Sequence, residues 1–181
     1  MNEKELVSRL RAKEEQAFEE LVQSYGPRLL RGARLLTGQS QLAEVLVSDA
    51  FAEAFFALPR YRAEAPLFNW LYGIMLNQFR YHCRKHKHFI NLESVADSLE
   101  AKETPVDDSD MLKRLPDCIG KLSPEHSSVI VLKYLEGKTT EEIADILAIP
   151  SGTVKSRVHN ALEFLRKTMN QMNLLPNSAT D

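Results

Sequence analysis

Apolar residues in the first ninety positions recur every three or four residues, the spacing that places them on one face of an α-helix. The pattern predicts a helical segment over residues 5–36, which the Gly26-Pro27 pair either kinks or divides into two helices. Gly38 is suited to end this segment in a left-handed conformation, and Ser40 to cap the next helix. That helix is predicted over residues 41–58, and a third from residue 67 to about 84 or beyond.

The second half of the chain has the same helical period. Four helices are predicted there, over residues 111–121, 124–135, 140–147 and 151–172. Ser123-Pro124 supplies a cap followed by a proline at the first helical position, and Thr139 with Glu142 forms the sequence of a capping box. No segment alternates apolar and polar residues at period two, so the sequence predicts an all-α protein.

Two of the predicted helices have an inward face that can be named in advance. In the helix over 41–58 the residues expected to point inward are Leu42, Val45, Leu46, Phe51, Ala54 and Phe55. In the last helix the expected buried stripe is Val154, Val158, Leu162 and Leu165.

Residues 140–158 have the pattern of a helix-turn-helix. A short helix carries small Ala144 where a second helix approaches closely, a turn ends at Pro150, and Ser151 is placed to cap the following helix. The outward face of that helix offers donors for phosphates and base edges, which with Thr140 make the predicted duplex-DNA contacts: Ser151, Thr153, Lys155, Ser156, Arg157, His159 and Asn160. An ordinary corner between two helices with a solvated polar face is the alternative.

Residues 60–87 interleave basic and aromatic side chains. Aromatic faces stack on unpaired bases and cationic groups neutralise phosphates, so this segment is a candidate single-strand surface. The aromatic residues are Tyr61, Phe68, Trp70, Tyr72, Phe79 and Tyr81. Helical spacing is equally typical of rings that belong to the core, and that alternative stays open for each of them.

Composition narrows the class of protein. The chain has 181 residues, 44% hydrophobic and 27% charged, which fits one medium or two small soluble domains. No apolar run is long enough to span a membrane, and no secretory signal is expected. Cys83 and Cys118 lie far apart and predict no disulfide framework, so a cytoplasmic location is expected. The sequence motifs of common catalytic sites are missing, so no enzymatic activity and no cofactor are predicted.

The net charge of −2 hides an uneven distribution. Residues 93–110 hold seven acidic side chains against one lysine, directly after a basic stretch at 61–92 with five basic side chains against one glutamate. The acidic segment also has little periodic hydrophobicity. It is interpreted as a flexible linker over 91–110 between a domain at 1–90 and one at 111–173, with a disordered tail at 174–181.

A group of potential metal ligands ends the third helix: His82, Cys83, His86 and His88. Histidines four residues apart share a helix face and could share a metal ion, which would suit a metal sensor or a metal-dependent enzyme. The spacing matches no complete ligand set, and a basic helix end at the negative pole of the helix dipole also explains it. No metal site is therefore predicted.

Six motifs in order make the chain resemble the extracytoplasmic-function sigma factors, the small two-domain promoter-recognition subunits of bacterial RNA polymerase. They are Tyr25-Gly26-Pro27-Arg28-Leu29 with Leu36-Thr37-Gly38; residues 43–51; Tyr61-Arg62-Ala63-Glu64-Ala65-Pro66 with Trp70-Leu71-Tyr72; Asn77; residues 122–126; and residues 141–157. The resemblance implies sigma region 2, a three- or four-helix bundle, at 1–90 and sigma region 4, a four-helix domain with the helix-turn-helix, at 111–173.

The resemblance also implies roles for particular residues. Contacts to core RNA polymerase are implied for Glu44, Asp49 and Glu53, whose alternative is a solvated helix face. Contacts to the minus-ten promoter element, which is opened and captured as flipped bases, are implied for Arg60, Tyr61, Arg62, Asn69, Trp70, Asn77, Arg80 and Arg84. The helix over 151–166 is implied to bind the minus-thirty-five element as duplex DNA. An anti-sigma factor is the implied regulator.

The chain departs from the family pattern at four positions. An acid is usual where this chain has Val45, a glutamine at Ser48, a glutamate at Asp49 and an aspartate at Tyr81.

The rival function is a stand-alone helix-turn-helix regulator, in which residues 1–90 sense a signal or dimerise and the chain binds duplex DNA without polymerase.

Overall fold

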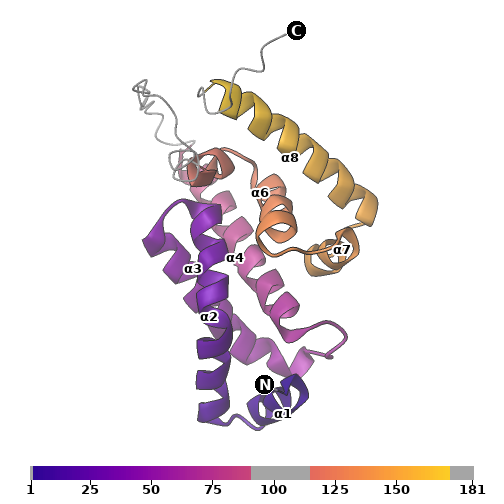
Figure 1. Ribbon diagram of the computed structural model, residues 1–181. Helices are drawn as coiled ribbons and strands as arrows, with labels where there is room; N and C mark the ends of the chain where they lie inside the picture. The colour runs from indigo at the N-terminus through magenta and orange to yellow at the C-terminus, as the bar shows by residue number, and fades with distance from the viewer. Residues whose placement is uncertain (1, 91–114, 172–181) are drawn as a thin grey trace.

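The computed structural model describes residues 2–90 and 115–171, with the side chains of 86–90 excepted (Figure 1). Every regular element in these ranges is helical, as predicted. The proposed linker at 91–110 and the tail at 174–181 lie outside the described residues. None of the helices in the two ranges combines the length and apolar character needed to cross a membrane.

The N-terminal helical segment divides at a place the sequence did not suggest. Helix α1 is Glu3–Arg11 and α2 is Glu15–Thr37, so the break falls at residues 12–14 and α2 continues through Pro27. Lys13 adopts a left-handed conformation there, with φ of 59°. Pro27 and Gln23 are both exposed, so water can satisfy the Gln23 carbonyl that the proline leaves without its amide partner.

Helix α3, Ser40–Ala57, follows a left-handed Gly38 as predicted, but the expected Ser40 cap is wrong. Ser40 is the first residue of the helix, and the preceding Gln39 makes no side-chain cap. The Thr37 hydroxyl takes part in the turn instead: it accepts a hydrogen bond from the Gln39 amide at 3.2 Å and donates to the Ala33 carbonyl at 2.9 Å.

Two of the side chains expected to point inward from α3 are exposed. Val45 is 48% and Phe55 43% exposed, whereas Leu46, Ala50 and Phe51 are buried. Helix α3 is apolar on nearly all sides, so its periodicity could not select the face that packs on α2 and on α4, Leu67–Ile90. A short 3₁₀ turn, Leu58–Arg60, joins α3 to the loop before α4.

The described part of the second domain starts with a helix over residues 115–120. The sequence predicted a helix over 111–121, of which residues 111–114 lie outside the described residues. Helix α6, Pro124–Ile130, is capped by the Ser123 hydroxyl, which accepts a hydrogen bond from the His126 amide at 3.3 Å. The predicted continuation to Leu135 is a π-helical turn, Val131–Leu135 (η2). The Glu136 amide donates to the Val131 carbonyl, and Gly137 is left-handed, so the chain turns sharply just after Glu136.

The helix-turn-helix is present in α7, Thr140–Leu147, and α8, Ser151–Gln171. The predicted capping box between Thr139 and Glu142 is confirmed. The predicted Ser151 cap is wrong, because Pro150 occupies the cap position: its carbonyl accepts hydrogen bonds from the Thr153 and Val154 amides in the first turn of α8. Leu162, which was predicted to be buried, is 42% exposed, and the neighbouring Ala161 is buried instead.

The two domains pack against each other (Figure 1). Helices α6 and α7 contact α4, and η2 contacts α2, so most of the second domain lies along one side of the first. Helix α8 packs on α6 and α7 and lies on the outer side of the molecule. This packing places α7 of the predicted helix-turn-helix against α4, which carries most of the residues implied to contact the minus-ten element.

Candidate nucleic-acid interface

A pocket of about 470 Å³ lies between α4 and α7. Its first-domain wall comes from the loop before α4 and from that helix, with Arg60, Tyr61, Arg62, Asn69, Trp70 and Asn77. Its opposite wall comes from α7, with Glu142, Asp145 and Ile146. The pocket therefore gathers six of the eight residues that were implied to contact the minus-ten element.

Tyr61 supports this pocket from beneath rather than offering an exposed ring. It is 4% exposed, and its hydroxyl donates to the Ala65 carbonyl at 2.6 Å, which closes the loop on itself. Its ring lies 4.9 Å from that of Trp70, measured between centroids. Burial, reinforced by nearby Glu3, raises the pKa of Tyr61 to about 12, so the phenol stays protonated as a donor.

Most aromatic rings of this segment belong to the core. Phe68, Tyr72 and Phe79 are buried, so the alternative interpretation is correct for these three. Trp70 is half-buried and lines the pocket, and Tyr81 is 54% exposed on the next turns of α4. The surface available for base stacking is thus much smaller than the sequence pattern indicated.

Asn69 is buried, and its side-chain oxygen has no hydrogen-bond partner among the described residues. The residue is 5% exposed. A buried amide oxygen without a donor is costly. Because Asn69 lines the pocket between Arg62 and Trp70, a donor group on a bound molecule could satisfy it there.

The remaining predicted minus-ten residues lie further along α4. Arg80 donates a hydrogen bond to the Asn77 side chain, and Arg84 is exposed. Burial lowers the pKa of Arg80, and Arg157 and Arg84 act in the same direction while Glu125 opposes them. Arg80 from the first predicted DNA surface and Arg157 from the second therefore lie close to the same carboxylate.

The carboxylate near both arginines is Glu125, at the start of α6, and its pKa is lowered. Partial burial would raise its pKa, but hydrogen bonds from its own backbone amide and the Ser123 hydroxyl, with Arg157 and Arg80 nearby, leave the pKa of Glu125 below its usual value. Glu125 thus stays charged between the two arginines.

The outward face of α8 is open to solvent over most of its predicted contacts. Ser151, Lys155, Ser156 and His159 are exposed. Thr153 and Arg157 are half-buried, as is Thr140 at the start of α7. The Ser156 hydroxyl donates to the Thr153 carbonyl at 3.0 Å, which fixes it on the helix. This face is continuous and polar, as a helix that enters a major groove requires.

The three predicted polymerase contacts are distributed along α3 and each has a neighbour in its own domain. Glu44 pairs with Arg34 at 3.6 Å, Asp49 with the His82 imidazole at 3.6 Å, and Glu53 accepts from Gln78 at 2.5 Å. Glu44 and Glu53 are exposed and Asp49 is half-buried.

Sequence reasoning missed an apolar groove beside these acids. It holds about 800 Å³ between α2 and α3 and is lined by apolar residues that include Phe18, Val22, Val47 and Phe51, with Glu44 at its edge. The sequence offered no signal for this groove, because helical periodicity counts Val22, which lines it and is 37% exposed, as an inward-facing apolar residue.

The metal-ligand hypothesis finds no support in the described side chains. His82 faces Asp49, and within residues 2–85 and 115–171 no group of three or more His, Cys, Asp or Glu is arranged to hold an ion. The side chains of His86 and His88 lie outside the described residues.

Comparisons with known proteins match both domains. The models for Sigma-70 region 2 and for Sigma-70, region 4 match residues 21–89 and 112–165. ECF RNA polymerase sigma factor SigL of Mycobacterium tuberculosis is 33% identical over 150 residues, covering 80% of this chain and 84% of the relative. RNA polymerase sigma-E factor of Streptomyces coelicolor is 32% identical over 156 residues, covering 84% and 85%.

Solved structures support the fold. CnrH in complex with the cytosolic domain of CnrY matches with a TM-score of 0.68 and 24% identity, covering 93% of this chain and 97% of that one. The sigma factor RpoE from Bartonella quintana, in complex with the anti-sigma factor NepR, matches with a TM-score of 0.67 and 24% identity, covering 84% and 96%.

A helix-turn-helix domain packed on a helical bundle defines a two-domain DNA-binding protein. The family matches make the assignment specific: the chain belongs to the extracytoplasmic-function RNA polymerase sigma factors. As a member of this family it binds core RNA polymerase and directs it to promoter DNA.

Proposed function

We propose that this sigma factor captures an unpaired minus-ten strand in the pocket on α4 and contacts the minus-thirty-five duplex through α8. The pocket carries the first part, because it combines a half-buried indole, two exposed arginines and the unsatisfied Asn69 oxygen. The indole of Trp70 stacks on a base, Arg60 and Arg62 neutralise phosphates, and the Asn69 oxygen accepts from a base edge.

Helix α8 supplies the second contact. Arg157 and Lys155 are placed for base edges and phosphates, and Ser151, Thr153, Ser156, His159 and the α7 residue Thr140 position the helix on the duplex. The protein performs no chemistry of its own in this scheme. It acts in the cytoplasm and gives sequence specificity to a polymerase that already has the catalytic site.

The domain organisation follows the same division. Residues 1–90 form the polymerase-binding and minus-ten domain, 111–173 the minus-thirty-five domain, and 91–110 the acidic linker between them. Polymerase docks on α3 through Glu44, Asp49 and Glu53, with the adjacent apolar groove adding buried area.

Regulation by an anti-sigma factor is part of the proposal. The matched RpoE structure holds the anti-sigma factor NepR, and the matched CnrH structure holds the cytosolic domain of CnrY. A partner of the same class is expected for this chain.

Run-off transcription tests the proposal. Purified core polymerase is assayed with and without the chain on a library of promoter fragments, using Trp70→Ala and Arg157→Ala as variants. Tyr134→Ala and Lys167→Ala are matched controls, since both side chains are exposed and lie away from the proposed contacts. We expect sequence-selective transcripts that Trp70→Ala and Arg157→Ala each reduce strongly and that both control variants retain.

Two other outcomes contradict the proposal. Tight duplex binding by the chain alone with no new start site would favour the stand-alone regulator. Transcripts that survive Trp70→Ala at the wild-type level would remove the pocket from minus-ten recognition.

A further inference from the structure

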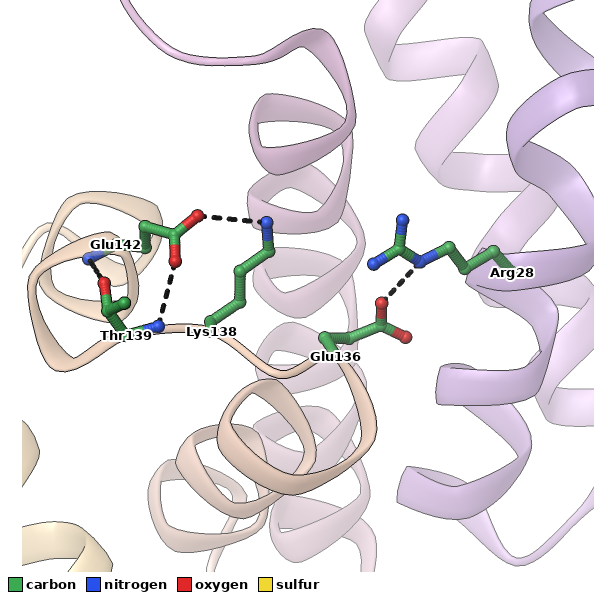
Figure 2. Close-up of polar contacts among 5 residues, drawn as sticks. All are labelled: Arg28, Glu136, Lys138, Thr139 and Glu142. Carbon is green, nitrogen blue, oxygen red and sulfur yellow. Dashed lines mark hydrogen bonds and ion pairs between the residues drawn. The ribbon is translucent and has the colours of Figure 1, made fainter.

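The segment after η2 places one charged side chain wholly inside the contact between the domains. The Glu136 side chain is 0% exposed and its Oε2 accepts from the Arg28 Nε at 2.6 Å, while Arg31 Nη2 lies 3.8 Å from its other oxygen. Figure 2 shows the Arg28 and Glu136 side chains pointing toward each other, Arg28 from α2 and Glu136 from the turn that follows η2. Within the described residues the Glu136 Oε1 has no hydrogen-bond donor.

This ion pair depends entirely on domain packing. Arg28 belongs to α2 and also lies over the Phe68 ring, 4.0 Å from its centroid, so it is held in place by its own domain. Glu136 belongs to the second domain and has these two arginines as its charged neighbours. When the domains separate, water solvates the carboxylate. When they are together without Arg28, the buried carboxylate loses its hydrogen-bonded partner and keeps, among the described charged groups, only the more distant Arg31, which is strongly unfavourable.

A second contact in the same interface favours a glycine. A Cβ added at Gly73 on α4 would lie 3.1 Å from the Ile146 carbonyl oxygen of α7, closer than side chains normally approach backbone. A glycine in the middle of a helix costs helix stability, so its presence here fits a site where another backbone comes close. Two unrelated features thus adapt the first domain to the second.

The docked α7 occupies the wall of the strand-binding pocket. Glu142 and Asp145 line the pocket together with Arg60 and Arg62, so carboxylates lie where the phosphates of a bound strand would approach. The capping box and Lys138 hold Glu142 in this position: its Oε1 accepts from Lys138 Nζ at 3.2 Å and its Oε2 from the Thr139 amide at 2.9 Å (Figure 2).

We propose that α7, as one wall of the pocket, blocks entry of the promoter strand in the unbound chain, and that the buried Glu136–Arg28 pair latches the two domains in this closed form. The inference rests on the proposed function in one respect, that the pocket binds single-stranded DNA. The latch itself needs neither an anti-sigma factor nor polymerase. Opening exposes Trp70 and Asn69 beside the two arginines, which are exposed in the closed form as well.

The first experiment measures closure without DNA. Trp70 is the one tryptophan of the chain, so acrylamide quenching of its fluorescence reports access to the pocket. Glu136→Arg places a third cation against Arg28 and Arg31 and is expected to raise the quenching constant roughly twofold or more and to increase the radius of gyration, because the open form becomes dominant. Glu163→Arg is the control, since it makes the same charge change on exposed α8.

Two further variants separate opening from misfolding. Arg28→Glu combined with Glu136→Arg restores opposite charges and is expected to return both readouts to the wild-type values. Gly73→Leu adds a side chain that meets Ile146 in the closed form alone, so it is expected to increase the radius of gyration while helical circular dichroism is retained. Glu136→Arg and Gly73→Leu variants that are both as compact and as protected as wild type would overturn the latch.

The second experiment measures inhibition. Fluorescence anisotropy follows a labelled mixed-sequence single-stranded 12-mer at low ionic strength. Glu136→Arg is expected to bind it roughly tenfold more tightly than wild type, since apparent affinity scales with the open fraction. An equal gain in Glu163→Arg, or opening without any gain, would overturn the inhibitory role. Both results are independent of the run-off assay, so failure of the latch and failure of sigma activity are distinguishable.

Discussion

The two surfaces that we propose for DNA contact differ in how far the rest of the chain covers them. On α8 the residues Lys155, Ser156 and His159 are exposed, and no part of the described chain covers them. On α4 the pocket around Trp70 is walled by α7 and shares its space with Glu142 and Asp145. The duplex surface is therefore ready for use in the closed form, and the single-strand surface becomes complete only after the domains move apart.

This difference matches the order of events at a promoter. Duplex DNA is available before melting, so an open α8 face allows first contact. An unpaired strand exists only after melting begins, and an exposed indole with two arginines would otherwise bind any single strand without sequence preference. Covering the pocket until polymerase and promoter are engaged limits such binding.

The largest expected effect is at the covered surface. Trp70→Ala removes the stacking partner of a captured base, which is worth about 2–3 kcal/mol. We expect promoter-specific run-off transcription to fall roughly 30- to 150-fold while duplex binding through α8 is unchanged. Trp70→Phe keeps an aromatic face and should recover part of the activity. Equal loss of duplex binding would mean that the two surfaces are not separable.

A smaller effect is expected at the exposed surface. Arg157→Ala should weaken binding to a minus-thirty-five duplex by about 1–2 kcal/mol and reduce the salt dependence by about one phosphate contact. The measurement is anisotropy over a salt series, with Lys167→Ala as control. An unchanged salt slope together with unchanged affinity would exclude Arg157 from the contact.

The helix that covers the pocket can be weakened from its cap. Thr139→Ala removes the hydroxyl that accepts from the Glu142 amide at 3.2 Å, and is expected to lower the free energy of unfolding by about 1 kcal/mol. Because α7 forms one wall of the pocket, acrylamide quenching of Trp70 should rise as well. Ser123→Ala, which removes the comparable cap of α6, is the control: a similar loss of stability with less change in quenching is expected.

The smallest expected effect is a pH dependence at the same cap. A hydrogen bond from the Thr139 amide, with Lys138 nearby, lowers the pKa of Glu142. A depressed carboxyl pKa stabilises the folded state above its ordinary value of about 4.3, and this contribution is lost as pH falls through the folded pKa. Urea unfolding from pH 6 to pH 3 should therefore be slightly less pH-dependent in Glu142→Gln than in wild type.

A neighbouring residue provides the control for this pH effect. Glu141 is exposed on the same turn of α7 and makes no part of the capping box. Glu141→Gln should keep the wild-type profile. If both variants flatten it equally, the general charge of the helix start, rather than the capping box, is responsible.

Local signals in the sequence were reliable where a few neighbouring residues decide the outcome. Gly38, the Ser123 cap and the Thr139–Glu142 box were predicted correctly, because each depends on backbone groups within four residues. The failures have tertiary causes. Pro150 occupies the cap position predicted for Ser151. Val45 is left exposed on α3, and Phe55 is only partly covered, by Phe18 of α2. Pro27 is tolerated because its face is solvated.

The candidate site shows the same division. The family motifs selected Arg62, Trp70 and Arg157 by residue type and spacing, which the sequence contains in full. Nothing in the sequence could show that Glu136, a single acid in a short turn, would be buried. Its partner Arg28 lies 108 positions earlier in the chain. That contact requires two domains to meet across an intervening segment, and no local pattern records such a meeting.

The sequence by itself determined the helices, the helix-turn-helix and the family, because period, caps and motifs are local properties of the chain. The tertiary structure alone decided which aromatic rings belong to the core and which are accessible to a bound strand. It also decided that α7 forms one wall of the pocket. The physical reason is burial: whether a ring, a carboxylate or a glycine is useful depends on what packs against it, and that is fixed only when both domains are in place.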